Sequence, residues 1–248
     1  MQRGRAVQSI GYHRRLPLGT ALCLAENLDR WGVDEILVIG IDRAGLGPDI
    51  PLLRELGRHG LTTPITFGGG ISSVAHAVSV VQAGADRILV DRLLEDNPDE
   101  VERIADRLGG QAVVGGFPMR IGPMGRLLRL RYWDGTEADL RDRTLRLLES
   151  NAVSEALLVD HQHEGMKRGY DLRMLDAFPI ESAPLVPFGG ISDSEIVGAA
   201  LAHPRVVAAA VGNFLSYREL AVPMLKSALR EYPVRHSALS LSQPEPRA

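Results

Sequence analysis

The sequence predicts a single (β/α)8 barrel of the TIM type, built from two duplicated half-barrels. Three observations support this. Short apolar runs alternate with longer amphipathic stretches, which is typical of buried parallel strands and the helices that cover them. The chain has 248 residues, 45% of them hydrophobic, a length usual for one α/β barrel domain. Segments of the first half also recur in the second half.

The repeat is clearest at two glycine-rich segments. TPITFGGGISSVAHAV aligns without gaps with APLVPFGGISDSEIVG, 120 residues further along the chain. A second pair keeps this offset, whereas a third, weaker pair needs an offset of 106, so extra residues enter the second half between about 118 and 136. The pairs are 63–78 with 183–198, 31–45 with 151–165, and 4–11 with 110–117.

Each half is expected to supply four strands, each followed by a helix. In the first half, strand 5–10 precedes helix 19–31, 35–40 precedes 48–59, 64–67 precedes 73–83, and 87–91 precedes 98–108. In the second half, strand 111–117 precedes helix 138–150, 155–160 precedes 170–177, 184–188 precedes 193–202, and 206–211 precedes 217–231. Ser72 and Ser192 are expected to cap the helices behind the glycines. An open doubly wound sheet is the alternative, but duplicated four-unit halves close naturally into a barrel.

The expected boundaries place the barrel at 1–236, with half-barrels at about 4–109 and 110–232, and a disordered polar tail at 237–248. The extra segment carries Asp134-Gly135, a hairpin-like turn signal. It is expected to hang over the barrel mouth as a long loop.

Composition narrows the class of protein. The single cysteine excludes an intramolecular disulfide framework and fits a reducing cytoplasm. No apolar run approaches 18 residues, and the first residues lack the apolar core of a signal peptide. A net charge of −3 without a long basic block gives no footprint for nucleic acid. We therefore expect a soluble cytoplasmic protein that binds neither membrane nor nucleic acid.

The glycine segments are candidate phosphate sites. In barrels of this kind the chemistry lies in the loops after the strands, and backbone N–H groups at a glycine-rich helix start bind phosphate oxygens. The alternative is that the glycines only make tight turns, but two copies half a barrel apart favour two binding sites. The candidate phosphate-binding residues are Gly69, Gly70, Asp91, Arg92, Gly165, Gly189, Gly190, Gly212 and Asn213.

Duplicated halves, two GGIS loops, AGADRILVD (83–91) and EGMKRGYD (164–171) together resemble the cyclase subunit of imidazole glycerol phosphate synthase. The resemblance covers nearly all of residues 4 to 232. It implies a barrel that receives ammonia through its core from a glutaminase partner and adds it to a substrate with a phosphate at each end. No cofactor is expected.

The chain departs from that family where acid–base chemistry is expected. The resemblance places catalytic aspartates at positions that here hold Gly11 and Glu164, and a further carboxylate at Pro118. We therefore predict a diverged member. The candidate catalytic residues are Glu164, His161, His163 and Asp42, with His13, Asp160 and Lys167 also at the mouth. The histidine pair lacks a convincing third ligand, so no metal site is expected.

At the opposite end of the barrel, the family closes its ammonia entrance with four charged residues. The matching positions hold Arg5, Glu35, Arg87 and Glu155, and Asp86 matches an aspartate that contacts the glutaminase. The alternative is a salt-bridge ring that only stabilises the barrel.

Three functions remain open. The first is a diverged synthase subunit that uses ammonia from a glutaminase to aminate a phosphorylated metabolite, such as a sugar- or nucleotide-derived one. The second is the genuine cyclase of histidine biosynthesis, with Glu164 acting alone. The third is a non-catalytic barrel that binds phosphate ligands and regulates a glutaminase.

Overall fold

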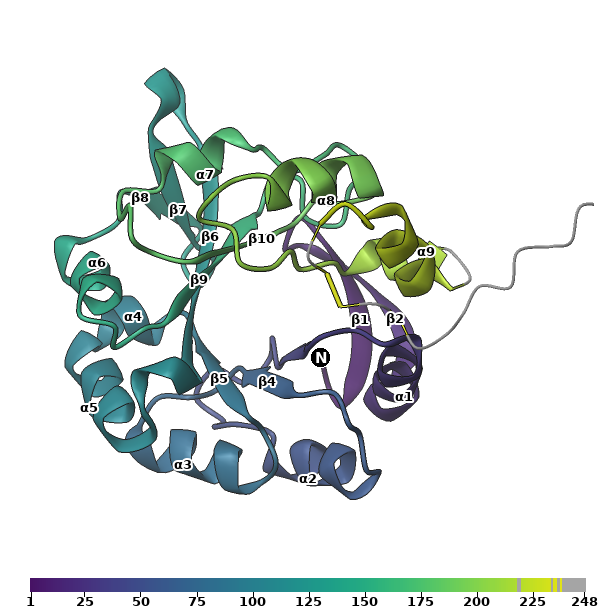
Figure 1. Ribbon diagram of the computed structural model, residues 1–248. Coiled ribbons are helices and arrows are strands. Elements are labelled where there is room, and N and C mark those ends of the chain that lie inside the picture. The colour runs from purple at the N-terminus through teal and green to yellow at the C-terminus, as the bar shows by residue number, and fades with distance from the viewer. Residues whose placement is uncertain (218–219, 233, 236, 238–248) are drawn as a thin grey trace, which may run out of the picture.

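The expected α/β barrel is confirmed. The computed structural model describes residues 1–217, 220–232, 234–235 and 237, so the tail from 238 onward lies outside the described residues. Six parallel strands form one continuous curved sheet with helices around its outside (Figure 1). In spatial order the strands are β3 (Ile36–Ile39), β4 (Ile65–Gly68), β5 (Arg87–Val90), β6 (Val113–Ile121), β9 (Glu155–Asp160) and β10 (Leu185–Phe188).

The helices begin close to the residues expected from the sequence. Five of them start at a residue whose side chain accepts a backbone N–H, which satisfies one of the free donors of the first turn; these residues are Thr20, Asp49, Ser73, Asn97 and Asp193. The expected caps Ser72 and Ser192 are wrong by one position, because the next residue caps the helix in both loops. The helices are α1 (Ala21–Trp31), α2 (Ile50–Arg58), α3 (Val74–Gln82), α4 (Leu93–Asp96), α5 (Pro98–Leu108), α6 (Asp142–Glu149), α7 (Arg173–Ala177), α8 (Ser194–Leu201) and α9 (Ala221–Ala228).

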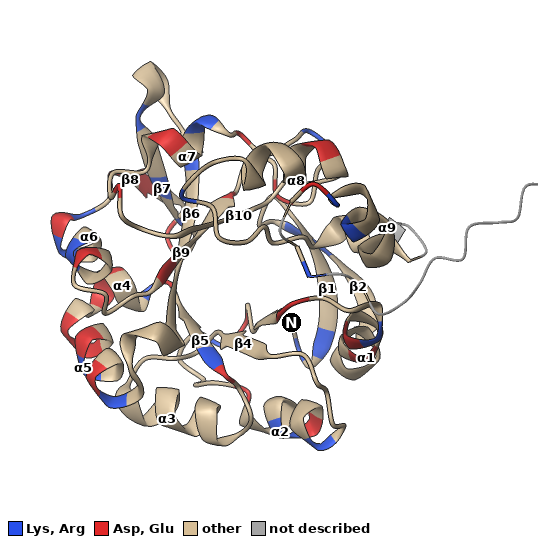
Figure 2. Cartoon of the chain, in the orientation of Figure 1, with Lys and Arg blue, Asp and Glu red and all other residues tan. Residues whose placement is uncertain are grey.

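Apolar side chains separate into two layers. The larger one packs the helices onto the outer face of the sheet and includes the fully buried Phe67 and Ile104. The smaller one lies inside the ring and includes Leu89, Val114 and Val159. Charged residues concentrate on the outer helices, notably α5 and α6 (Figure 2). No described helix is long and apolar enough to cross a membrane.

The first strand departs from the expected arrangement. β1 (Arg5–Ile10) pairs with β2 (Arg14–Thr20), an antiparallel strand that we did not expect. β2 contains Pro17, which argues against a central strand but is tolerated at a sheet edge. The amino terminus lies beside the carboxyl end of β3, because Met1 N donates to Ile39 O and Ile41 N donates to Met1 O. β1 therefore starts on the mouth side of the barrel.

The expected eighth strand, 206–211, is not a strand. It runs beside β10 with one isolated parallel bridge, Leu185 to Val206, and with a hydrogen bond from Ala210 N to Pro187 O. Alanine has little preference for strands, and β1 is paired with β2 instead of with this segment. The parallel sheet therefore ends at β3 on one side and at β10 on the other.

The extra segment of the second half is an extension of the sheet, so the prediction of a long loop over the mouth is wrong. β6 continues into antiparallel pairing with β7 (Leu127–Arg131), and β7 pairs with β8 (Thr136–Ala138). The expected turn at Asp134-Gly135 is confirmed, with Gly135 N donating to Arg131 O and Thr136 N donating to the Asp134 carboxylate.

Candidate functional site

Glu164 lies in the loop that follows β9, and its side chain is 5% exposed. Its carboxylate accepts hydrogen bonds from the Ser9 hydroxyl at 3.2 Å and the Tyr12 backbone N–H at 3.3 Å. Burial raises the pKa of this carboxyl, and these hydrogen bonds oppose the rise. Glu164 can therefore exchange a proton closer to neutral pH than an exposed glutamate.

Gly11 lies at the turn of the β1–β2 hairpin, and its N–H donates to Glu164 O at 2.9 Å. A Cβ added at Gly11 would lie 2.9 Å from Nε2 of His13. The His13 ring therefore occupies the space into which a side chain at position 11 would extend.

Asp160, the last residue of β9, is 1% exposed and orients His163. Its carboxylate lies 2.7 Å from Nδ1 of His163 and also accepts the backbone N–H groups of His163 and Asp171. When the imidazole is neutral and Nδ1 donates to Asp160, Nε2 is the acceptor. This pair thus has a fixed tautomer of the kind needed in a general base.

The other two candidate catalytic residues lie apart from this pair. His161 Nε2 is 3.5 Å from the Glu137 carboxylate on β8, and burial lowers the pKa of its ring. Asp42 accepts the backbone N–H of Arg3 at 2.6 Å, which ties it to the amino-terminal turn. Among the described residues, no group of three histidine, cysteine, aspartate or glutamate side chains is placed to hold a metal ion.

The second glycine loop opens onto a cavity of about 350 Å³. The cavity is lined by Gly189 and Gly190 together with Glu164, Gly165, Lys167, Gly212 and Asn213. All but Lys167 belong to the expected phosphate-binding or catalytic set, so the structure brings those residues together. The Asn213 amide nitrogen donates to Ser9 O at 2.5 Å, which fixes its side chain at the cavity wall.

Both glycine pairs also have a structural reason to be glycine. A Cβ at Gly69 would lie 2.2 Å from Gly40 O, and one at Gly189 would lie 2.6 Å from Asp160 O. Gly40 directly follows the neighbouring strand β3, and Asp160 ends the neighbouring strand β9. Both glycines have positive φ. The alternative considered from the sequence, that these glycines make tight turns, is therefore true of both copies, whether or not phosphate binds.

The residues expected to complete the first phosphate site are engaged elsewhere. Asp91 forms an ion pair with Arg129 at 2.5 Å, and Arg92 forms one with Asp96 at 2.7 Å while its guanidinium lies over the Trp133 ring. Burial raises the pKa of Asp91 to about 6, although Arg129 opposes the rise. The geometry argues against Asp91 as a phosphate ligand, because it presents a carboxylate at the place where phosphate was expected.

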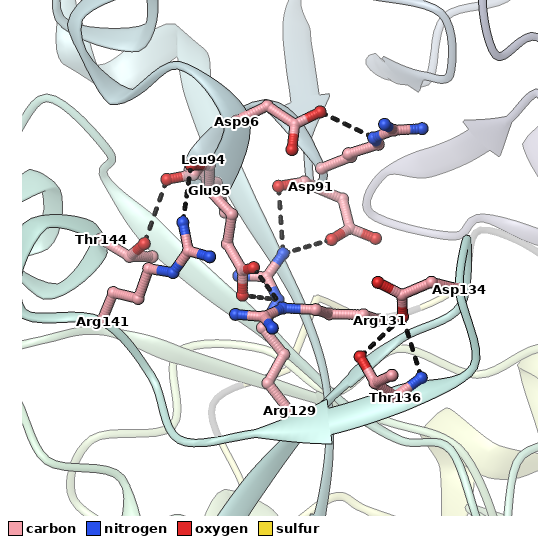
Figure 3. Close-up of polar contacts among 11 residues, drawn as sticks. Asp91, Leu94, Glu95, Asp96, Arg129, Arg131, Asp134, Thr136, Arg141 and Thr144 are labelled. Carbon is pink, nitrogen blue, oxygen red and sulfur yellow. Dashed lines mark hydrogen bonds and ion pairs between the residues drawn. The ribbon is translucent and has the colours of Figure 1, made fainter.

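Sequence reasoning missed the arginines of the extension. Arg129 on β7 is fully buried, with Nη2 donating to the Asp91 carboxylate and backbone oxygen and Nε 3.3 Å from Glu95. Arg131 donates to the same Glu95 at 2.7 Å (Figure 3). The signal was present in LRLR (128–131), in which Arg129 and Arg131 lie on one face of the strand, but nothing in the sequence identified their carboxylate partners.

At the opposite end of the barrel, three of the four expected entrance residues meet. Arg87 lies 3.5 Å from Glu35 and 3.0 Å from Glu155, and its side chain is 21% exposed. Arg5 is exposed and pairs with Gln2, which follows Met1 beside the carboxyl end of β3, so the structure does not place it with the other three. Asp86 accepts the Ile65 backbone N–H at 2.8 Å.

Comparison with known proteins agrees with this barrel. Residues 1–221 match the family model described as histidine biosynthesis protein. The imidazole glycerol phosphate synthase subunit HisF of Dictyoglomus thermophilum is 29% identical over 223 residues, covering 86% of each chain. The protein of the same name from Synechocystis is 27% identical over 250 residues, covering 95% of this chain and 94% of the relative. The chain therefore belongs to the histidine biosynthesis protein family and resembles its HisF cyclase subunits.

Proposed function

We propose that this protein is the acceptor subunit of a glutamine amidotransferase, which uses ammonia from a glutaminase partner to aminate a phosphorylated metabolite. The observation that carries the proposal is the position of Glu164. A buried carboxylate with a raised pKa lies at the wall of a cavity formed by the second glycine loop. An acid–base group thus adjoins a surface suited to a phosphate-bearing substrate.

Three features of the cavity suit a phosphate. Glycine loops leave backbone N–H groups unobstructed, and Asn213 supplies an amide group. Lys167, also at the cavity, supplies a positive charge. Once the phosphate is held there, the rest of the substrate extends toward Glu164 and the mouth.

The chemistry assigned to Glu164 is proton transfer during ammonia addition. As a carboxylate it accepts a proton from the attacking nitrogen, and as a carboxylic acid it returns one to a departing oxygen. His163, held by Asp160, supplies a second proton-exchanging group near the second glycine loop, since its Cβ lies 2.8 Å from a Cβ added at Gly190.

The substrate is proposed to differ from that of the related HisF subunits. Gly11 and Pro118 cannot transfer a proton, and they occupy positions at which the resemblance implies carboxylates. The His13 ring beside Gly11 gives that part of the mouth a different chemistry. These differences favour a diverged reaction over the cyclase reaction of histidine biosynthesis.

An ammonia route through the barrel accounts for the charged cluster at its base. Arg87 joins Glu35 and Glu155 at the amino ends of three strands, around the apolar interior layer. A glutaminase docked at that end would deliver ammonia to these residues. Arg5 is not included in this proposal.

The test is co-expression with a glutaminase encoded nearby, followed by measurement of glutamine consumption and mass spectrometry of metabolites. We expect a new aminated phosphate compound that disappears in Glu164→Gln and persists in Glu102→Gln, an exposed control on α5. Restored growth of a cyclase-deficient strain would contradict the divergence and favour the genuine cyclase. Glutaminase activation by ligand without any aminated product would favour a regulatory barrel.

The route has a separate test in Glu155→Gln. If the cluster guides ammonia, the ratio of product formed to glutamine consumed falls, because ammonia escapes to solvent. If the cluster only stabilises the barrel, the folded variant keeps the wild-type ratio, and the route is rejected.

A further inference from the structure

The two halves of the mouth differ in charge and in exposed chemistry, although the sequence repeat suggests two equivalent sites. Every residue lining the cavity at the second glycine loop comes from the second half, between 164 and 214. The corresponding part of the first half lies at the end of β5, where Asp91 and Arg92 follow the strand. Their side chains determine what that part of the mouth can bind.

Asp91 presents a carboxylate at this place. Its side chain is 24% exposed, so it remains accessible from the mouth, and Arg129 holds it at 2.5 Å from behind. In the second half the corresponding loop carries Gly212 and Asn213, which are neutral. A carboxylate accepts hydrogen bonds and repels a phosphate, whereas an amide can donate to one.

The surrounding charges do not reverse this preference. Arg129 also lies 3.3 Å from Glu95, and Arg131 donates to Glu95, so two arginines face two carboxylates (Figure 3). Arg92, the remaining cation of the loop, is engaged by Asp96. Each of these three arginines thus lies against a carboxylate.

Aromatic side chains surround the same carboxylate. Burial, and after it the charge of Asp91, raises the pKa of the Tyr132 hydroxyl, and the Tyr132 ring lies 6.1 Å from the Tyr12 ring and 5.2 Å from the Trp133 ring. Tyr132 is 46% exposed, so its side chain is available to a ligand. A carboxylate acceptor beside an exposed aromatic ring suits an uncharged ring that carries hydroxyl or amino donors.

We infer that the substrate carries one phosphate, bound at the second glycine loop, and that its other end is an uncharged, donor-bearing ring held by Asp91 and Tyr132. This rests on the proposed function and narrows its substrate class to monophosphates of a sugar or a nucleoside. It excludes a substrate with a phosphate at each end.

The test is titration calorimetry of the purified chain with inorganic phosphate, ribose 5-phosphate and ribulose 1,5-bisphosphate. We expect one equivalent of inorganic phosphate, and tighter binding of ribose 5-phosphate than of either other ligand. Two equivalents of phosphate, or preference for the bisphosphate, would overturn the inference while leaving the proposed function intact. Absence of all phosphate binding would overturn both.

Variants locate the two ends. Asp91→Asn should weaken ribose 5-phosphate at least tenfold and leave the Kd of inorganic phosphate within twofold, whereas Asn213→Asp should weaken both ligands. Asp106→Asn, a matched control at an exposed position of α5, should change neither. Unchanged ribose 5-phosphate binding in Asp91→Asn contradicts the assignment. If that variant does not fold, Tyr132→Phe tests the same contact, and the wild-type ligand comparison needs no variant.

Discussion

Replacing Arg129 by methionine should destabilise the protein strongly, because it removes a buried cation. Methionine is similar in size, so the effect reports the lost charge and not a cavity. Arg129 is 0% exposed, and its Nη2 bonds to Asp91 at 2.5 and 3.0 Å. Glu95 keeps Arg131, so Asp91 is the carboxylate left uncompensated. Breaking one side of a buried ion pair costs about 3–5 kcal/mol. We expect the lower end of this range, a loss of about 3 kcal/mol, because Asp91 is partly exposed. A loss of this size corresponds to a fall in melting temperature of roughly 6–12 °C.

The loss should depend on pH. The folded-state pKa of Asp91, about 6, already exceeds its ordinary value of 3.8, so the folded protein binds this proton more tightly than the unfolded chain. Stability from this group is therefore complete below about pH 4 and is lost as pH rises to about 6, by up to ~1.4 kcal/mol per pH unit. Without Arg129 the pKa rises further, so the loss continues to higher pH. Arg129→Met should be closer to wild type at pH 5 than at pH 8.

The assay is urea unfolding followed by circular dichroism at both pH values. Arg126→Met is the matched control, because Arg126 precedes β7 and forms an exposed ion pair with Asp139, worth about 0–1 kcal/mol. A loss in Arg129→Met no larger than that in the control at pH 8 would refute the reasoning. An equal loss at both pH values would refute the part assigned to Asp91.

Three further predictions concern other parts of the chain. Gly69→Ala should cost about 1–3 kcal/mol more than Gly45→Ala in urea unfolding, because both glycines have positive φ but only Gly69 faces a backbone oxygen, that of Gly40, at 2.2 Å. Asp29→Ala should lower the free energy of unfolding by about 1 kcal/mol at neutral pH, because it removes hydrogen bonds from two threonines. These hydrogen bonds lower the pKa of Asp29, so the difference in unfolding free energy between variant and wild type should vanish as pH falls below 3.8. In the amination assay, activity that depends on the Glu164 carboxylate should rise with pH through a midpoint above 4.5, since burial raises its pKa, and a lower midpoint would contradict this.

The sequence predicted the parts of the fold that depend on local pattern. Six strands of the parallel path and the eight expected helices lie close to their expected positions, because apolar runs and capping residues specify such elements locally. The β1–β2 hairpin and the missing strand at 206–211 were not predicted. Both depend on which strand pairs with which across the chain, and local preference does not determine that choice.

The candidate site divides in the same way. Glu164 and the second glycine loop share one cavity, as the repeat and the resemblance suggested. The pairing of Asp91 with Arg129 joins residues 38 positions apart through a sheet extension absent from the first half. A repeat indicates which loops correspond, but a segment inserted into one copy can alter the environment of the other.

The contacts behind Gly69 and Gly189 affect how this family can change its ligands during evolution. Each glycine allows two backbone segments to approach more closely than any side chain would permit. A barrel of this kind would therefore keep the glycines even if a loop no longer held a phosphate, since replacing them would disturb folding. A descendant can exchange one ligand group for another by altering the residues around an unchanged motif. In such descendants the glycines indicate the family to which a protein belongs, and the neighbouring side chains indicate the ligand that it binds.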